Sequence, residues 1–382
     1  MTNVVGPGST IGILGAGQLG RMLAVSARQM GYRIAVFGGD RDSPAGQVSD
    51  LAWPGAFDDE DKLLEFARAC DVVTYEFENI PSHAAAAIDQ HAPLCPGVNL
   101  LQTAQNRFAE KTALSSIGLR TAEFRMVRSS EELASARDDF GGAVVLKANT
   151  DGYDGKGQWS ITPTDDAESA WSEASLNEGI VEERIDFDFE LSIVAGRYAD
   201  GTAVFYDPLL NDHANHILDV SVSAAPQVTE AVTNEAVEMA RAVLEHFDVV
   251  GVLCIELFLT HDGHLVVNEI APRPHNSGHL TIEAYHCSQF ELQLRTICGL
   301  PSVPLLRRSP SAAMANLLGQ HIPDAWRAES LTPLESPNTS LHLYGKPESR
   351  LNRKMGHITA TGADPTAVEQ TVRLARETLL QP

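Results

Sequence analysis

Two glutamates, Glu256 and Glu269, occupy matching positions in a predicted β-hairpin. Apolar, partly β-branched runs flank Asp262-Gly263, and Asp-Gly between two such runs is typical of a hairpin turn. With a two-residue turn there, Glu256 faces Glu269 directly, with Cβ atoms roughly 4.5–5.5 Å apart. Carboxylates that close repel unless a cation lies between them. The pair predicts a site for Mg²⁺, with Mn²⁺ as the alternative ion, because such ions take one or two carboxylates plus substrate phosphates. A register slip or bulge that turns one glutamate to solvent is the competing interpretation.

A lysine and a glycine-rich loop upstream are suited to hold those phosphates. Lys147 lies near the end of the strand-like run AVVLKAN, and the segment 152–158, GYDGKGQ, follows it. The backbone N–H groups and the ammonium group of such a loop can close over phosphates. The loop is not a Walker A motif, because its Gly-Lys pair is not followed by Ser or Thr. A plain flexible hairpin loop is the alternative.

A βαβ unit is predicted over residues 10–37. TIGIL reads as a buried strand, GAGQLG (15–20) as a turn that opens a helix, and YRIAVF as a second, parallel strand. The GxGxxG spacing lets backbone N–H groups approach a phosphate at the helix N-terminus, and Asp40 follows where a ribose-binding acid would lie. On this motif alone, the turn predicts a nicotinamide or flavin site, as in a Rossmann NAD(P)-dependent oxidoreductase, and the alternative is a glycine turn with another ligand or none.

Helices and strands alternate through the rest of the chain. A strand is predicted to end at Glu76 and Glu78, where ligands of open α/β sheets bind. Amphipathic helices are predicted at 106–119, 234–247 and 288–300, and two strands within 180–196. Ala92-Pro93 and Cys95-Pro96-Gly97 predict a first domain boundary near residues 95–105. The proline-rich segment 301–311 predicts a second boundary, and a small α+β module follows it.

Composition excludes several classes of partner. The chain has 382 residues, a net charge of −23, 43% hydrophobic residues and 21% charged residues, which predicts a globular protein of two or three domains. A charge of that sign repels nucleic acid and anionic membranes. No apolar run is long enough to span a membrane, and no signal peptide is evident. The five cysteines form no CxxC pair, so we expect reduced thiols in a cytoplasmic protein.

A set of motifs, in this order along the chain, resembles one enzyme family. They are GQLGRM (17–22), TYEFEN (74–79), GYDGKGQ (152–158), NEIAPRPHNSGH (268–279), SQFELQLR (288–295), LHLYGK (341–346) and RKMGH (353–357). As a set they are similar to the 5-(carboxyamino)imidazole ribonucleotide synthases, which are ATP-grasp enzymes of purine biosynthesis. The resemblance implies an α/β and α+β protein with a Rossmann-like pre-ATP-grasp domain (1–105), an ATP-grasp domain (106–300) whose mobile lid covers about 120–182, and a small C-terminal domain (301–382).

The resemblance also implies which residues bind the two substrates. Those expected to hold ATP are Arg107, Lys147, Gly152, Tyr153, Asp154, Gly155, Lys156, Gly157, Gln158, Glu182, Glu183, Arg184, Ile185, Glu190, His213, Asn268 and Glu269. Those expected to face the aminoimidazole ribonucleotide are Gln18, Leu19, Glu76, Tyr153, Asp154, Arg273, His275, Ser277, Lys346 and Arg353. Lys346, Arg350, Arg353 and Lys354 form a basic group that is suited to clamp the 5′-phosphate, and a solvated charged loop is the alternative. Two segments depart from the pattern: Glu269-Ile270-Ala271 lacks the Asn of the usual Glu-x-Asn, and LLNDHANHILD differs around His213.

The expected reaction is ATP-dependent carboxylation of 5-aminoimidazole ribonucleotide. Bicarbonate attacks the γ-phosphate, giving carboxyphosphate and ADP, and the amine then takes the carboxyl group, either directly or through released CO₂ held in a closed site. Lys147 and Arg273 neutralise charge, and Asp154 is the candidate base. A homodimer is the expected assembly. Alternatives are a formate-dependent glycinamide ribonucleotide transformylase, the Rossmann oxidoreductase, and a nucleotide-binding module without catalysis.

Overall fold

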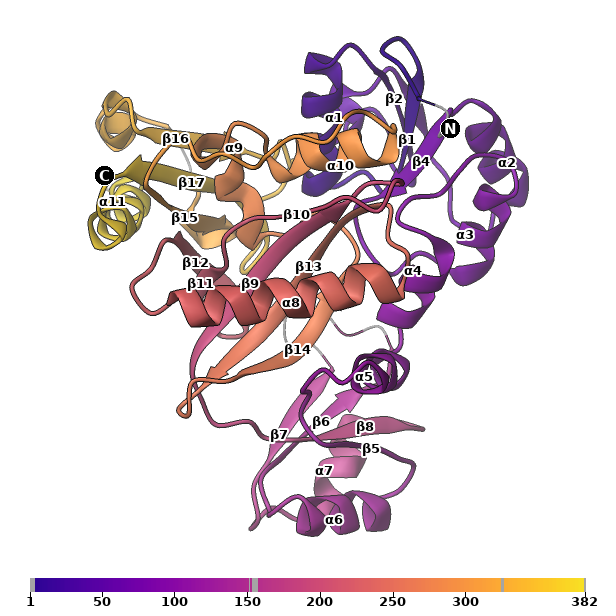
Figure 1. Ribbon diagram of the computed structural model, residues 1–382, viewed down its shortest axis with the longest axis vertical. Helices are drawn as coiled ribbons and strands as arrows, with labels where there is room; N and C mark the ends of the chain where they lie inside the picture. The colour runs from indigo at the N-terminus through magenta and orange to yellow at the C-terminus, as the bar shows by residue number, and fades with distance from the viewer. Residues whose placement is uncertain (1–3, 151, 153–156, 324–325, 381–382) are drawn as a thin grey trace.

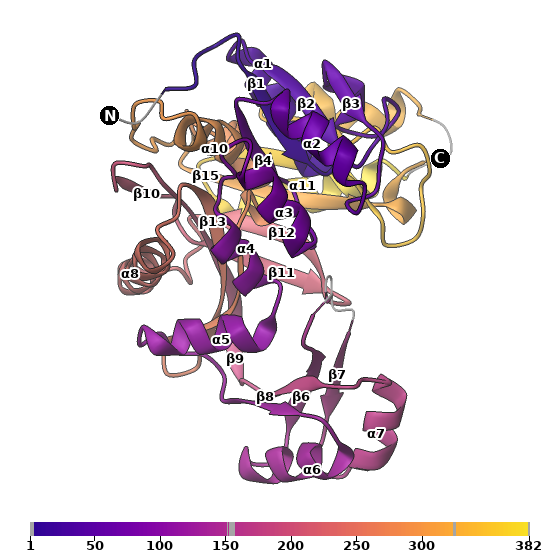
Figure 2. The same ribbon diagram turned by 90° about the vertical axis from the view of Figure 1, so that its right-hand side faces the viewer.

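The computed structural model describes residues 4–150, 152, 157–323 and 326–380. Within these residues the chain forms three sheets (Figure 1). The N-terminal sheet and the large central sheet lie together, and the third sheet belongs to a smaller unit at the far end of the molecule (Figures 1 and 2). No described helix combines the length and the apolar character needed to cross a membrane.

The N-terminal unit is a parallel sheet of strand order β3-β2-β1-β4. The βαβ unit predicted for residues 10–37 is therefore correct. The elements are β1 (Thr10–Leu14), α1 (Gln18–Gln29), β2 (Arg33–Phe37), η1 (Gly46–Val48), β3 (Leu51–Trp53), α2 (Glu60–Arg68), β4 (Val72–Tyr75), α3 (Ser82–Asp89) and α4 (Val98–Ala104).

The small unit is an antiparallel sheet of order β5-β8-β6-β7, with α6 and α7 packed against it (Figure 1). Its elements and the helix that leads into it are α5 (Arg107–Ser116), β5 (Phe124–Val127), α6 (Ser130–Asp139), β6 (Val144–Ala148), β7 (Gln158–Ile161), α7 (Ala167–Ala174) and β8 (Gly179–Glu183). The predicted lid range, about 120–182, coincides with this sheet, and the 152–158 loop joins β6 to β7.

The central sheet has the order β14-β13-β9-β11-β12-β15-β17-β16, with β10 paired to β9. Its first part contains β9 (Phe187–Arg197), β10 (Ala203–Phe205), β11 (Leu209–Ala214), β12 (Ile217–Ser223), α8 (Glu230–His246), β13 (Gly251–Thr260), β14 (Leu265–Ala271), η2 (Ser277–Leu280), α9 (Thr281–Ala284) and α10 (Gln289–Ile297). After residue 301 come β15 (Ser311–Leu318), η3 (Gly319–His321), η4 (Glu329–Glu335), β16 (Thr339–Leu343), β17 (Lys354–Gly362) and α11 (Pro365–Thr378). Because β15 pairs with β12, strands on both sides of the predicted boundary at 301 share one sheet.

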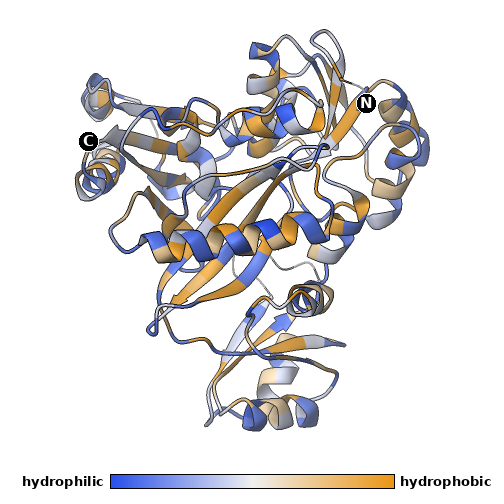
Figure 3. Cartoon of the chain, in the orientation of Figure 1, coloured by the Kyte–Doolittle hydropathy of each residue, from blue (hydrophilic) through white to orange (hydrophobic). Residues whose placement is uncertain are grey.

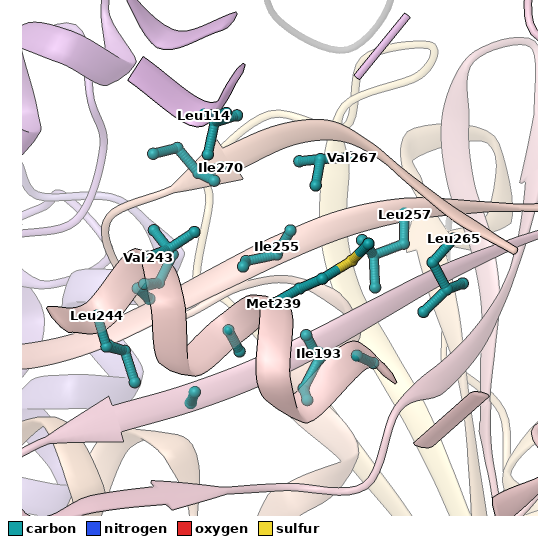
Figure 4. Packing of buried hydrophobic residues seen from close by; sticks show 14 of the residues in the cluster. Leu114, Ile193, Met239, Val243, Leu244, Ile255, Leu257, Leu265, Val267 and Ile270 are labelled. Atoms are coloured by element: carbon teal, nitrogen blue, oxygen red, sulfur yellow. The ribbon is translucent and has the colours of Figure 1, made fainter. Parts of the chain in front are cut away.

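The main core lies between α8 and the strands that carry the glutamate hairpin. Met239, Val243 and Leu244 of α8 pack against Ile193 of β9 and Ile255 of β13 (Figure 4). Hydrophobic residues dominate these central strands, and α8 alternates hydrophobic with hydrophilic positions (Figure 3). The side chain of Thr229, the N-cap of α8, accepts a hydrogen bond from the Val232 N–H, as expected for a helix start. This packing makes the hairpin a rigid platform for the site.

The hairpin places Glu256 opposite Glu269, as predicted, but by a different route. The turn has three residues rather than two, since Thr260 N–H donates to the His264 carbonyl and Gly263 adopts φ +82°. That turn alone would bring Asn268 opposite Glu256. A β-bulge at Asn268 shifts the register by one and restores the glutamate pair.

Candidate active site at the junction of two cavities

Two cavities, of about 460 Å³ and 510 Å³, meet over the glutamate hairpin. The first opens toward the N-terminal sheet and is lined by residues such as Gln18, Leu19 and Glu76. The second lies between the small sheet and the central sheet. Six residues line both cavities: Arg107, Glu256, Glu269, His275, Asn276 and Lys354. The six form the junction, where ligands in the two cavities would meet.

The second cavity gathers most of the residues predicted to hold ATP. Those that line it are Arg107, Lys147, Gln158, Glu182, Glu183, Arg184, Ile185, Glu190, His213, Asn268 and Glu269. Consecutive residues of a regular strand point to opposite faces, yet Asn268 and Glu269 both line this cavity because the bulge re-aims one of them. Glu190 Oε2 lies 2.8 Å from His213 Nδ1, and this contact raises the pKa of His213 although burial would lower it. The divergent segment around His213 therefore still reaches the cavity.

Glu182 is held between two buried lysines. Its Oε2 lies 2.8 Å from Lys147 Nζ and 3.4 Å from Lys111 Nζ, and the three side chains are 5%, 8% and 2% exposed, respectively. Burial would raise the pKa of Glu182, but the charges of Lys147 and Lys111 outweigh it and hold the pKa at about 2. Burial lowers the pKa of Lys111. The cluster ties β6 and β8 to helix α5 and fixes Lys147 at the wall of the cavity.

Each glutamate of the pair has a cationic partner. Glu269 Oε2 accepts from Arg107 Nη1 at 3.0 Å, and Glu256 Oε1 lies 2.9 Å from His275 Nε2. Burial would raise the pKa of Glu256, but the hydrogen bond and charge of His275 hold it at about 2, so the group is ionised. Two opposed carboxylates that line both cavities are an oxygen donor set of the kind Mg²⁺ uses. The residues fit the predicted metal.

The glycine turn does not offer a dinucleotide site. Glu76 Oε1 accepts from Gly17 N–H and Oε2 accepts from Gly20 N–H at 2.7 Å, at the N-terminus of α1. A carboxylate of the protein thus occupies the position where a pyrophosphate would bind. The possible ribose-binding acid, Asp40, instead accepts from the backbone of its own turn, at Asp42 and Ser43. The dinucleotide interpretation is wrong, because β4 delivers Glu76 to that helix end.

Arg273 and His275 are placed by two different networks. Arg273 forms a bidentate ion pair with Glu78, in which Nη2 donates to Oε1 at 2.9 Å and Nε donates to Oε2. Arg273 also lines the first cavity. Nδ1 of His275 lies 2.9 Å from the Ser277 hydroxyl. The Ser277 hydroxyl accepts from Ser192 at 2.7 Å. This chain orients the imidazole toward Glu256.

Ser277 was predicted to face the substrate, and its position contradicts that role. Its side chain is fully buried and lines neither cavity. The 3₁₀ turn that begins at Ser277 directs the hydroxyl inward, toward the chain of hydrogen bonds that continues from Ser192 to Asn211 and Ser221. Ser277 therefore supports His275 instead of touching a ligand.

The remaining predicted residues are only partly covered by the structure. Of the loop GYDGKGQ, Tyr153, Asp154, Gly155 and Lys156 lie outside the described residues; Gly152 lines the first cavity. Gly157 has φ +71°, and its carbonyl accepts from Ala148 N–H at the start of the loop.

In the basic clamp, Lys346 Nζ donates to the Lys354 carbonyl at 2.6 Å, and Arg353 donates to the Glu348 carbonyl at 3.0 Å. Of the four residues of the predicted clamp, Lys354 lines both cavities, and Lys346, Arg350 and Arg353 line neither. A direct contact of Lys346 or Arg353 with substrate stays a prediction.

Sequence reasoning missed three buried polar residues of the site: Glu110, Lys111 and Asn276. Glu110 accepts from the Ile270 N–H at 2.6 Å, and burial, together with the charge of Glu269, raises its pKa to about 8. Glu110 and Lys111 were available as two charges on the inner side of a predicted amphipathic helix, a pattern that signals buried ion pairs. Asn276 lies between two predicted residues, in a stretch without periodicity that would single it out.

Three sequence families match successive parts of the chain. The ribonucleotide synthetase preATP-grasp domain matches residues 9–105, the ATP-grasp domain 112–290, and the phosphoribosylaminoimidazole carboxylase C-terminal domain 312–371. Among solved structures, an N5-carboxyaminoimidazole ribonucleotide synthetase in an ADP complex is 38% identical, with a TM-score of 0.91 and 98% of each chain covered. The Aspergillus clavatus N5-carboxyaminoimidazole synthase, with ADP and 5-aminoimidazole ribonucleotide, is 29% identical, with a TM-score of 0.86 and coverage of 97% and 98%.

Curated relatives of similar length are N5-carboxyaminoimidazole ribonucleotide synthases. The N5-carboxyaminoimidazole ribonucleotide synthase of Bacillus subtilis is 40% identical over 93% of this chain and 92% of its own length. The N5-carboxyaminoimidazole ribonucleotide synthase of Brucella melitensis is 41% identical over 92% of this chain and 96% of its own length. A bifunctional purine synthesis protein of Dictyostelium discoideum is 39% identical, but the match spans 37% of that longer protein. The chain therefore belongs to the family of N5-carboxyaminoimidazole ribonucleotide synthases, within the ATP-grasp enzymes.

Proposed function

We propose that the chain carboxylates 5-aminoimidazole ribonucleotide with bicarbonate and ATP, giving 5-(carboxyamino)imidazole ribonucleotide, ADP and phosphate in purine biosynthesis. The observation that carries this proposal is the pair of cavities that meet at Glu256 and Glu269. One cavity has the cations and strand ends that suit a nucleoside triphosphate. The other has Glu76, which follows β4 of the parallel sheet, and Arg273, which follows β14 of the central sheet. Two substrates bound in this way have their reacting ends at one junction.

On the nucleotide side, the protein positions phosphates and neutralises charge. Lys147, pre-ordered by Glu182, and Arg107 face the phosphates of ATP in the second cavity. The strand end Glu182–Ile185 presents backbone groups to the adenine edge, and the 152–158 loop closes over the phosphates. Bicarbonate attacks the γ-phosphorus, the bond to the bridging oxygen of ADP breaks, and carboxyphosphate forms.

Glu256 and Glu269 are the residues that would hold Mg²⁺, for which Mn²⁺ is the alternative. When bound, such an ion would supply charge neutralisation for the phosphates of ATP. Glu269 keeps Arg107 on one oxygen, which leaves its second oxygen for the ion. His275 on Glu256 orients that carboxylate in the same way.

On the substrate side, Glu76 and Arg273 hold the aminoimidazole and its ribose phosphate near the junction, with Gln18 and Leu19 at the end of α1. Tyr153 and Asp154, on the loop that closes the site, are proposed to complete it, with Asp154 as the base for the amine. The carboxyl group then passes from phosphate oxygen to the exocyclic nitrogen, and phosphate leaves. Exclusion of water protects the labile carboxyphosphate.

The decisive experiment measures ADP formation from ATP with bicarbonate, in the presence and absence of 5-aminoimidazole ribonucleotide. We expect strong stimulation by the nucleotide and formation of its N-carboxy product. If glycinamide ribonucleotide with formate stimulates ADP formation instead, the chain is a transformylase. If no acceptor nucleotide stimulates the rate, the proposal fails.

We further propose that the chain acts in the cytoplasm as a homodimer with reduced cysteines. The family resemblance supports the dimer, and the free state of all five cysteines is consistent with a reducing compartment. Light scattering coupled to size-exclusion chromatography tests the dimer, and a mass near the 41.2 kDa of one chain would refute it.

A further inference from the structure

Asn276 is the one residue of the junction whose side chain is both buried and unpaired in the described part of the chain. It is 9% exposed, and neither Nδ2 nor Oδ1 has a hydrogen-bond partner there. An asparagine that precedes a 3₁₀ turn ordinarily caps it, but this side chain makes no capping bond to η2. Burying both ends of a carboxamide without partners is costly, so a ligand is the expected partner.

The position of Asn276 limits what that ligand is. It lines both cavities, whereas Glu76 lines the first alone and Lys147 lines the second alone. Its neighbours at the junction already have partners: Arg107 is paired with Glu269, and His275 with Glu256. The group that must lie between the γ-phosphate and the acceptor amine is the one-carbon unit that is transferred.

We propose that the Asn276 carboxamide binds bicarbonate at the junction of the two cavities and orients it for attack on ATP. This inference rests on the proposed carboxylation. A carboxamide has one donor edge and one acceptor edge, and bicarbonate has an ionised carboxyl oxygen and a hydroxyl group. Nδ2–H donates a hydrogen bond to the ionised oxygen of bicarbonate, and Oδ1 accepts a hydrogen bond from its hydroxyl group. The remaining oxygen forms the bond to the γ-phosphorus as the bond to ADP breaks, and no proton needs to move in that step.

The test uses full-length protein with Asn276→Ala and Asn276→Asp, in which the carboxamide is removed or its donor edge is replaced by a negative charge. We expect KM for bicarbonate to rise about tenfold to a hundredfold in both variants, as when hydrogen bonds to a charged group are lost. KM for ATP and for the aminoimidazole ribonucleotide should change much less. The matched control is Asn79→Ala, an exposed asparagine that lines the first cavity alone. Its KM for bicarbonate should stay within about twofold of the wild type.

Thermal unfolding of the ligand-free variants separates a binding role from a structural one. A side chain without partners contributes little to the folded state, so Asn276→Ala should unfold at the wild-type temperature or above it. A lower unfolding temperature with an unchanged KM for bicarbonate would overturn the inference, and so would a rise confined to the KM of the ribonucleotide. If wild-type protein shows no bicarbonate-dependent ADP formation, the proposed function and this inference fail together. If the wild type is active but the variants keep its KM for bicarbonate, the inference alone fails.

Discussion

Replacing Glu182 with glutamine should lower the free energy of unfolding of the unit that contains the small sheet. The size of the loss measures how strongly Glu182 stabilises the two buried lysines. The variant keeps the shape of the side chain but leaves Lys111 and Lys147, both less than a tenth exposed, without their shared anion. The fall of the pKa of Glu182 from 4.5 to about 2 corresponds to about 3 kcal/mol at neutral pH. Removing one partner of a buried ion pair costs about 3–5 kcal/mol in other proteins, which agrees with that value.

The effect should depend on pH in a defined direction. Because folding lowers the pKa of Glu182, its contribution is complete above the unfolded value of 4.5 and is lost as the pH falls from 4.5 toward 2. The difference in unfolding free energy between the wild type and Glu182→Gln should thus be greatest at neutral pH and shrink below pH 4.5. High salt should change the difference little, because the buried charges are poorly screened.

Urea unfolding followed by tryptophan fluorescence is the suitable assay. Trp159 on β7 and Trp171 on α7 both pack against the core of the small unit, so their fluorescence reports on the unit that contains Glu182. Glu183→Gln is the matched control, since the described ion pairs do not include Glu183, and it should differ from wild type by less than about 0.5 kcal/mol. A loss below about 1 kcal/mol at neutral pH, or a loss that persists unchanged at low pH, would refute the electrostatic reasoning.

Three further predictions concern catalysis. Gly17→Ala places a Cβ 2.8 Å from Glu76 Oε1, so the carboxylate must move, and KM for the ribonucleotide should rise about tenfold while KM for ATP stays unchanged in initial-rate assays. Glu269→Gln should raise the Mg²⁺ concentration for half-maximal ADP formation about tenfold or more, and an unchanged metal titration would exclude Glu269 as a ligand. Ser277→Ala removes one hydrogen bond from His275, so kcat should fall about fivefold without a change in KM for bicarbonate, and a larger change in a substrate KM would point back to direct contact.

The glutamate pair shows why some of the site could be predicted and some could not. The opposition of Glu256 and Glu269 follows from two apolar runs around a turn, and the structure confirms it. The argument that led to it nevertheless assumed the wrong turn, and the bulge at Asn268 corrected the register by one residue. The alternation of apolar and polar residues along a strand can be read from the local sequence. The position of a bulge cannot, because it depends on how the strand packs in the folded sheet, which here brings Asn268 and Glu269 to the same cavity. The prediction was right because two deviations compensate.

The glycine turn shows the opposite case. Its strand-turn-helix geometry was predicted correctly, but its ligand was not readable from the motif alone. The occupant of the helix N-terminus, Glu76, comes from another strand about sixty residues away, so spacing within the turn carries no information about it. Ser277 fails for a related reason, since neighbouring residues His275 and Asn276 line the cavities while its own hydroxyl turns inward. Motifs identify segments, and tertiary packing decides which side chain of a segment meets the ligand.

A chain with a net charge of −23 can bind anionic substrates because its site contains cations, three of which are held by carboxylates of the protein. Lys147 forms an ion pair with Glu182, Arg107 with Glu269, and Arg273 with Glu78. These pairs keep the site close to neutral and hold the cations in place before substrate arrives, so binding costs little side-chain entropy. They also set a constraint, because phosphates that draw Arg107 away leave Glu269 in need of a new cation. Mg²⁺ and ATP should therefore bind more tightly together than the product of their separate affinities, and titrating each in the presence of the other measures that coupling.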